Sequence, residues 1–327
     1  MTENTTATRA DGIAAQLPRV ESALRAAVHT DDPLLTEMAA HLITAGGKRQ
    51  RPLVGLASGA CAAGFDGGDL DGRIVQGGVA VELVHLGSLY HDDVIDEAEI
   101  RRQADSVNAR WGNLRAILAG DFLLARASEI AASLSTEIAG LLAATIAHLC
   151  EGEVSELRTA FSPDRTEDEY FASIGGKTAS LFRAAARIGA LTSGQPREAV
   201  DALGEFGWAY GMAFQIVDDI LDLTASEAEM GKPVGHDIAE GVYTLPVLHA
   251  LKSDRGDELA GLLGGEITDA DVALARRIVH ETAGVTQATV SVGHWLDRAE
   301  QSLAGFDGRE GAAALMGLTG RLRASLD

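Results

Sequence analysis

The sequence predicts an all-α protein that forms a single large domain. Ala and Leu, which are strong helix formers, recur along the whole chain. Pro occurs only 7 times in 327 residues, so long segments can remain helical without a break. Hydrophobic residues make up 46% of the sequence, which is enough apolar material for a large core.

The expected domain begins after a polar N-terminal segment. We interpret residues 1–11 as a disordered tail. Residues 12–327 show helical patterns separated by short breaks rich in Gly or Asp, such as AGFDGGDLDG and TSGQPRE. None of these breaks is long enough to divide the chain, so we expect one domain over residues 12–327.

The charge and cysteine content narrow the class of protein. A net charge of −21 disfavours a general nucleic-acid binder, which needs a basic face, but it permits phosphate ligands at locally basic sites. Cys61 and Cys150 form no disulfide framework, and we expect both to be buried thiols. No apolar signal core and no uncharged run of about 20 apolar residues is present. We therefore expect a cytoplasmic protein.

The first motif, HDDVID, closes a helix expected over residues 71–96. At 3.6 residues per turn, four polar residues share one face of this helix: His85, Ser88, Asp92 and Asp96. Paired arginines, Arg101 and Arg102, follow the motif.

The second motif, DDILD, closes a helix expected over residues 198–223. The predicted core stripe of this helix consists of Leu203, Phe206, Tyr210, Val217 and Leu221. A polar face opposes the stripe, made of Gln215, Asp218, Asp219 and Asp222.

Acidic runs on helices usually form solvated surface, but these two stand on largely apolar helices. Clustered carboxylates repel one another and are seldom buried alone, so they must face water or a cation. Two such helices facing each other would form an oxygen-rich site that suits Mg²⁺. Zn²⁺ would require His or Cys ligands at suitable spacing, and the sequence lacks them.

A Mg²⁺ site of this kind implies a phosphate ligand, and several basic stretches could hold one. Residues 46–52, GGKRQRP, place three cations on a glycine-led turn before a helix. GKT at residues 176–178 would open another helix, and GKP at residues 231–233 follows the second acidic motif. Each stretch alone would more often be a surface feature; together they favour a diphosphate site.

The chain resembles the trans-type isoprenyl diphosphate synthases, the polyprenyl synthetase family. The matching segments run from residue 46 to residue 246 in the order of the family: GGKRQRP, HDDVID with the following RR, RWGNLRAILAGDFLLARA, IGGKTASLF, FQIVDDILD, and GKPVGHDI leading to YTLP. The resemblance implies antiparallel helices around a deep central cavity, more than one Mg²⁺ ion, a homodimer, and a product handed to the membrane.

The resemblance also implies a role for each matching residue. Mg²⁺ would be bound by Asp92, Asp96, Asp218 and Asp222. Isopentenyl diphosphate would be held by Lys48, Arg51, His85 and Arg102. The allylic prenyl diphosphate would be held by Arg101, Lys177, Thr178, Gln215 and Lys232. The residues implied to be catalytic are Asp92, Asp96, Asp218 and Lys177. Taken alone, His85 would be interpreted as a core histidine; its place on the face of Asp92 and Asp96 favours the ligand role.

The implied reaction needs no side-chain nucleophile. Cations stabilise the leaving diphosphate, the allylic C–O bond ionises, and the isopentenyl double bond attacks the carbocation. A proton is then lost to the released diphosphate. The sequence shows no Ser–His–Asp or Cys–His arrangement that would indicate covalent catalysis instead.

Three residues depart from the family pattern. Val242 stands where the family usually has the Lys of Gly-Lys-x-Thr-Leu-Pro, so one expected cation for the allylic diphosphate is missing. Glu156 stands where Gln is usual, and Gln103 where Gly is common. None of the three replaces a predicted Mg²⁺ ligand.

The length of the product is expected to depend on the residues one turn before Asp92. A bulky aromatic there stops growth in short-chain members of the family, whereas this chain has Gly87 and Ser88. Tyr90 is bulky but lies about 160° around the helix from Asp92. We therefore predict an all-trans product longer than geranylgeranyl diphosphate; the alternative is a geranylgeranyl or farnesyl diphosphate synthase.

Three other classes of protein remain as alternatives. A terpene cyclase would carry an Asn/Asp-Ser/Thr-Glu triad as its second motif and would not need GGKRQRP. A non-catalytic subunit of a heteromeric prenyl synthase would be expected to lose its aspartates, and this chain keeps both sets. A structural acidic protein would bind no diphosphate in the presence of Mg²⁺.

Overall fold

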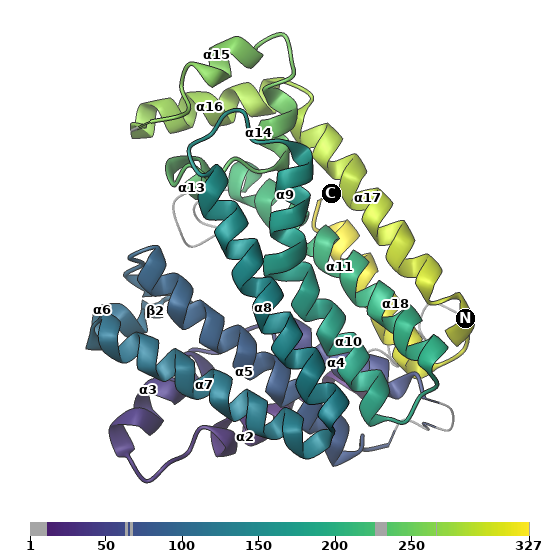
Figure 1. The fold of residues 1–327 in the computed structure, drawn as a ribbon. Helices are drawn as coiled ribbons and strands as arrows, with labels where there is room; N and C mark the ends of the chain where they lie inside the picture. Colours follow the sequence, from purple (N-terminus) through teal and green to yellow (C-terminus); the bar gives the residue numbers. More distant parts are fainter. Residues whose placement is uncertain (1–11, 63–64, 66–67, 226–233, 266, 327) are drawn as a thin grey trace. The chain divides into compact units, whose positions relative to one another are not determined.

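A computed structural model of the chain describes residues 12–62, 65, 68–225, 234–265 and 267–326. The predicted tail, residues 1–11, and Lys232 lie outside the described residues. The chain divides into two compact units, which are treated separately. Almost every element is a helix (Figure 1), so the prediction of an all-α fold is confirmed.

Unit 1 comprises Met1–Ile146, Leu181–Gly207 and Ser302–Gly317. Its elements are α2 (Leu17–Ala27), α3 (Pro33–Thr44), α4 (Gln50–Ala60), α5 (Gly72–Ile95), β1 (Ile100–Arg101), β2 (Ala104–Asp105), α6 (Val107–Trp111), α7 (Asn113–Leu134) and η2 (Ala304–Phe306), with parts of α8 (Thr136–Thr159), α10 (Ser180–Thr192), α11 (Arg197–Thr224) and α18 (Glu310–Ala324).

Unit 2 comprises Ala147–Ser180, Trp208–Gln301 and Leu318–Asp327. It takes the remaining parts of α8, α10, α11 and α18, together with α9 (Glu167–Ile174), η1 (Gly175–Ala179), α13 (His236–Ala239), α14 (Leu245–Ala250), α15 (Gly256–Ala260), α16 (Asp269–Glu281) and all but the last residue of α17 (Gly284–Ser302).

Helix α5 forms the centre of unit 1. It contacts α2, α4, α6 and α7, and residues 79–84 are at most 1% exposed. The run VAVELV is apolar on every side except at Glu82, which is the pattern of a core helix. Asp71 caps the first turn by accepting a hydrogen bond from the Arg73 N–H at 2.7 Å, and Asp96 is the C-cap residue. The helix predicted over residues 71–96 is therefore confirmed.

Helix α11 confirms the second predicted helix. It spans Arg197–Thr224, and four members of the predicted core stripe are buried while Leu221 is half-buried. In unit 2 its buried residues include Met212, Ile216 and Ile220. The acidic motif at the C-terminal end of α11 is thus anchored on an apolar helix.

A short antiparallel ribbon follows α5 in unit 1. Ile100 pairs with Asp105 and Arg101 with Ala104. The two linking residues, Arg102 and Gln103, both have positive φ, at 53° and 62°. A two-residue hairpin loop with positive φ at both positions favours Gly or Asn. The backbone thus explains why Gly is common at position 103 in the family, and Gln103 is strained by comparison.

Candidate active site

The end of α5 carries the first acidic motif, whose three aspartates differ in exposure. Asp92 is half-buried and Asp96 is exposed. Asp93 is completely buried, and its Oδ1 accepts a hydrogen bond from Arg101 Nε at 2.6 Å. Burial raises the pKa of Asp93, and Arg101 opposes that rise. Asp93 therefore positions Arg101, whereas Asp92 and Asp96 remain accessible at the surface of unit 1.

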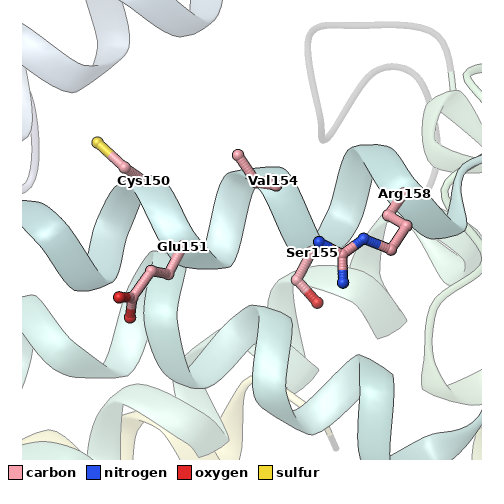
Figure 2. A pocket seen from close by; sticks show the side chains of 5 residues that line it. All are labelled: Cys150, Glu151, Val154, Ser155 and Arg158. Carbon is pink, nitrogen blue, oxygen red and sulfur yellow. The ribbon is translucent and has the colours of Figure 1, made fainter.

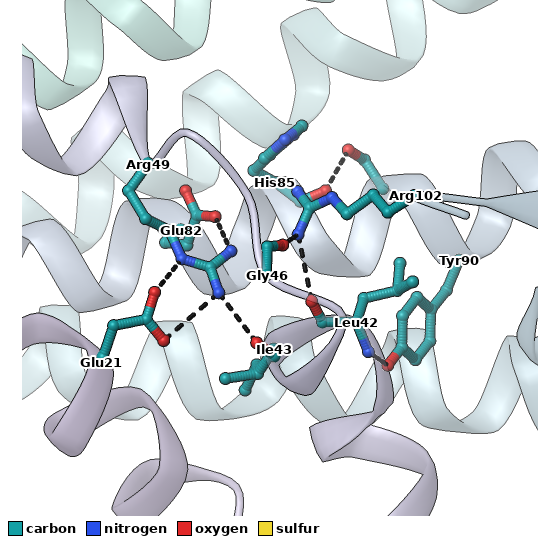
Figure 3. Close-up of polar contacts among 10 residues, drawn as sticks. Glu21, Leu42, Ile43, Gly46, Arg49, Glu82, His85, Tyr90 and Arg102 are labelled. Carbon is teal, nitrogen blue, oxygen red and sulfur yellow. Dashed lines mark hydrogen bonds and ion pairs between the residues drawn. The ribbon is translucent and has the colours of Figure 1, made fainter. Parts of the chain in front are cut away.

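The ribbon after α5 brings Arg102 to the glycine-led turn. Arg102 Nη1 donates to the carbonyl oxygen of Leu42 at 3.1 Å and to that of Gly46 (Figure 3). Gly46 and Gly47 both have positive φ, as the sequence pattern of a turn predicts. The turn and the ribbon, which lie about 50 positions apart in the sequence, thus form one structure.

Arg49 is an anchor of this turn and is not available to a ligand. Its guanidinium pairs with Glu21 at 2.5 Å and with Glu82 at 2.8 Å, and it also donates to the Ile43 carbonyl at 3.1 Å (Figure 3). The side chains of Arg49 and Glu82 are each 2% exposed. Arg49 is one of the three cations predicted on the turn, and the structure buries it in ion pairs. Of the other two, Lys48 is exposed and Arg51 is half-buried.

His85 lies among the arginines of unit 1. Burial lowers the pKa of His85 well below its usual value, and the charges of Arg51, Arg102, Arg49 and Arg101 lower it further. His85 is therefore a neutral hydrogen-bonding group in a basic environment. Of the four residues predicted to hold isopentenyl diphosphate, the structure brings three into one electrostatic cluster: Arg51, His85 and Arg102.

In unit 2, Lys177 and Thr178 lie in a π-helical turn between α9 and α10. This turn, η1, continues from α9 directly, so the prediction that GKT opens a helix is wrong. The irregular turn is the physical reason, because it carries the chain from one helix into the next without a cap. Such turns occur frequently at functional sites. Lys177 Nζ pairs with Glu156 at 2.6 Å and with Glu153 at 2.8 Å.

A hydrogen-bonded chain links η1 to α11 within unit 2. The Thr178 hydroxyl donates to Gln215 Oε1 at 2.7 Å, and Gln215 Nε2 donates to Asp219 Oδ1 at 2.9 Å. The Tyr170 hydroxyl donates to Asp219 Oδ2 at 2.5 Å. Burial raises the pKa of Asp219 to about 7, although both hydrogen bonds oppose the rise. Tyr170, in the middle of α9, was not among the predicted site residues, because no sequence motif marks it.

The other two aspartates of the second motif have unequal surroundings. Asp218 is exposed, whereas Asp222 is 2% exposed. Asp222 Oδ2 accepts a hydrogen bond from the Asp237 N–H at 3.3 Å, and the Asp222 carbonyl accepts one from the Gly235 N–H at 2.9 Å. Asp222 therefore joins the end of α11 to the segment that leads into α13.

The acidic motifs supply hard oxygen donors in pairs. Within the part of the chain that the structure describes, no group of three or more His, Cys, Asp or Glu side chains could hold a metal ion. A closed protein cage is therefore absent from the described residues. Mg²⁺ bound to a diphosphate takes one or two carboxylates and completes its shell with water and phosphate oxygens. The donor set of Asp92 with Asp96, and the exposed Asp218, fit that chemistry.

Gly87 does not border open space. A Cβ built on Gly87 would lie 3.1 Å from the Gly120 carbonyl oxygen and 3.1 Å from Leu124 Cγ, both on α7. The small residue therefore accommodates the close packing of α7. That Gly87 and Ser88 leave the floor open for a long product stays a prediction. Ser88 is half-buried, and its hydroxyl donates to the His85 carbonyl at 2.9 Å.

Helix α8 differs from the expectations drawn from the sequence. By length and composition alone, α8 could cross a membrane, and core helices of soluble proteins also meet this criterion. In the most apolar stretch of α8, 28% of the residues are buried.

The two cysteines differ in exposure. Cys150, which was expected to be buried, is exposed, while Cys61 is buried. A hollow on α8 is lined by Cys150, Glu151, Val154, Ser155 and Arg158 (Figure 2). The predicted site residues do not line it.

Comparison with known proteins agrees with these features. A family model described as polyprenyl synthetase matches residues 32–281. The chain is 38% identical over 316 residues to a nonaprenyl diphosphate synthase of Mycobacterium tuberculosis, covering 95% of this chain and 93% of that protein. It is 39% identical over 303 residues to component 2 of a heptaprenyl diphosphate synthase of Geobacillus stearothermophilus, covering 92% and 93%.

A solved structure shows the same fold. The polyprenyl synthase of Caulobacter crescentus, complexed with calcium and isoprenyl diphosphate, superposes with a TM-score of 0.88 at 31% identity, covering 97% of this chain and 98% of that chain. The helices and the two acidic motifs thus define a protein of the helical prenyl synthase class. The chain belongs to the polyprenyl synthetase family.

Proposed function

We propose that the protein condenses isopentenyl diphosphate head-to-tail with an allylic diphosphate to give an all-trans polyprenyl diphosphate longer than geranylgeranyl. The observation that carries this proposal is the cluster of Arg51, Arg102 and neutral His85 in unit 1. A family member that binds only one diphosphate would have no need for a second basic set. The relatives named nonaprenyl diphosphate synthase and heptaprenyl diphosphate synthase component 2 support the length.

Each motif has a distinct role in the proposed reaction. Lys48, Arg51 and Arg102 bind the diphosphate of isopentenyl diphosphate, and His85 donates or accepts a hydrogen bond there as a neutral group. Bound Mg²⁺ supplies charge neutralisation for the leaving allylic diphosphate. Asp92, Asp96, Asp218 and Asp222 are the proposed Mg²⁺ ligands.

The allylic diphosphate is held by a second set of residues. Lys177, Thr178 and Gln215 come from η1 and α11, and Arg101 comes from the ribbon of unit 1, where Asp93 fixes its guanidinium. Lys232, which lies outside the described residues, completes the set on family grounds. Charged donors that are already oriented need little rearrangement as charge develops on the leaving group.

The decisive experiment is turnover by the purified protein expressed alone. Farnesyl and isopentenyl diphosphates with Mg²⁺ should yield products longer than geranylgeranyl diphosphate, identified by mass spectrometry. Asp92→Asn and Asp218→Asn should each lower kcat by at least about 10²-fold, as should chelation of the metal. Products that end at geranylgeranyl would favour the short-chain alternative. Activity that survives both substitutions would refute the proposed metal ligands.

We also propose that the protein acts as a homodimer in the cytoplasm and hands its product to the membrane. Three large apolar residues of α7 are exposed, Leu114 by 74%, Ile117 by 41% and Leu118 by 54%, which supports an association surface on unit 1. The relative named component 2 raises the alternative of a heteromeric synthase. Light scattering and turnover of the isolated protein separate the two, because a subunit would be inactive alone.

A further inference from the structure

Lys177 is already occupied by two carboxylates of α8. Its Nζ lies 2.6 Å from Glu156 Oε1 and 2.8 Å from Glu153 Oε2. The Lys177 side chain is 33% exposed, and the two glutamates are 15% and 16% exposed. Partial burial makes these pairs stronger than typical surface pairs. An incoming anion must therefore compete with α8 for the ammonium group.

Two glycines allow this arrangement. A Cβ on Gly152 of α8 would lie 2.4 Å from the Lys177 backbone N, and a Cβ on Gly176 would lie 2.7 Å from the His148 carbonyl oxygen. The backbones of α8 and η1 can approach this closely only because neither residue has a side chain. Glu153 and Glu156 are three positions apart, so they project from the same side of α8 toward Lys177.

The cluster of Lys177, Glu153 and Glu156 contains two carboxylates and one ammonium group. One lysine and two glutamates give a net charge of −1, whereas the usual Gln at position 156 would give zero. Glu156 is held in place on the other side by the Ser173 hydroxyl, which donates to its Oε2 at 3.4 Å, while its Oε1 lies 2.6 Å from Lys177 Nζ. The excess negative charge therefore lies where the proposed allylic diphosphate binds.

We propose that Glu156 is a specificity-determining residue, which competes for Lys177 and weakens the binding of the allylic diphosphate. This inference rests on the proposed function, in which Lys177 holds that substrate. Glu156 acts in the same direction as Val242, which replaces a usual cation, so both departures from the family pattern reduce the positive charge available to the same ligand. Binding of isopentenyl diphosphate, which uses Lys48 and Arg51 of unit 1, is unaffected.

Glu156→Gln tests the inference, because it removes the charge and keeps the shape. The KM for farnesyl diphosphate should fall about fivefold, which corresponds to roughly 1 kcal/mol for one partly exposed ion pair. The KM for isopentenyl diphosphate should not change. Glu151→Gln makes the same substitution at an exposed position of the same helix and should leave both KM values as they are. An unchanged or higher KM for farnesyl diphosphate would overturn the inference.

Binding without turnover separates this inference from the proposed function. Inorganic diphosphate in the presence of Mg²⁺, titrated calorimetrically, should bind about fivefold more tightly to Glu156→Gln than to the wild type. If no polyprenyl product forms but this difference appears, the proposed function fails, and what stands is that Glu156 competes with a diphosphate for Lys177. If product forms and neither KM nor Kd changes, the inference fails alone. Glu153→Gln, which releases Lys177 from the other carboxylate, should shift Kd in the same direction and serves as the second variant.

Discussion

Replacing Arg49 by Met should destabilise the protein far more than removing an ordinary ion pair. The Arg49 guanidinium and Glu82 are 2.8 Å apart with side chains 2% exposed, and the guanidinium also donates to Glu21 and to the Ile43 carbonyl. Removing one partner of a buried ion pair leaves an uncompensated buried charge and lowers the free energy of unfolding by about 3–5 kcal/mol. The positive charges of Arg51 and Arg102 also stabilise the Glu82 carboxylate and remain in the variant. We therefore expect a loss at the lower end of this range, about 3 kcal/mol.

Urea unfolding followed by circular dichroism measures this loss, and an exposed pair provides the control. Arg197 and Glu137 are 2.6 Å apart, but their side chains are 54% and 48% exposed. Arg197→Met should therefore cost at most about 1 kcal/mol. Adding Glu82→Gln to Arg49→Met should recover part of the lost stability, because the buried charge is then gone.

The same variant should affect substrate binding. Arg49 fixes the turn that carries Lys48 and Arg51, so Arg49→Met should raise the KM for isopentenyl diphosphate more than the KM for farnesyl diphosphate. If Arg49→Met were no more destabilising than Arg197→Met, Arg49 would be an ordinary surface cation and its role as an anchor of the turn would be refuted.

Three further predictions concern other parts of unit 1. Gln103→Gly should raise the free energy of unfolding by roughly 0.5 kcal/mol, since φ of 62° is unfavourable for a side chain; a decrease in urea unfolding would contradict this. The folded-state pKa of His85 is depressed, so its contribution to stability is complete above about pH 6.5 and is lost as pH falls toward that lower pKa. His85→Asn should therefore lose less stability than the wild type between pH 7.5 and 5.5, and equal losses in both proteins would exclude this role. Ser88→Phe should shorten the product, and an unchanged length by mass spectrometry would place the growing chain elsewhere.

The two main helices could be predicted because their signals are local. An apolar run and a terminal acidic motif indicate α5, and the core stripe indicates α11. Family resemblance identified the candidate residues in the same way, because the motifs are short and each stands on one helix or turn. The local sequence thus reveals which candidate residues are present and which helix or turn carries each of them.

The tertiary structure determines which charged side chains form buried ion pairs within the protein. The sequence does not distinguish Arg49 from Arg51, yet in the structure the Arg49 guanidinium forms a buried ion pair with Glu82 at 2.8 Å. Asp92 and Asp93 are neighbours, yet only Asp93 is buried against Arg101. Likewise, the motif GKT does not reveal that α8 supplies two carboxylates to Lys177. Such pairings join residues far apart in the chain, and a local pattern cannot specify them, because they depend on how closely two backbones approach.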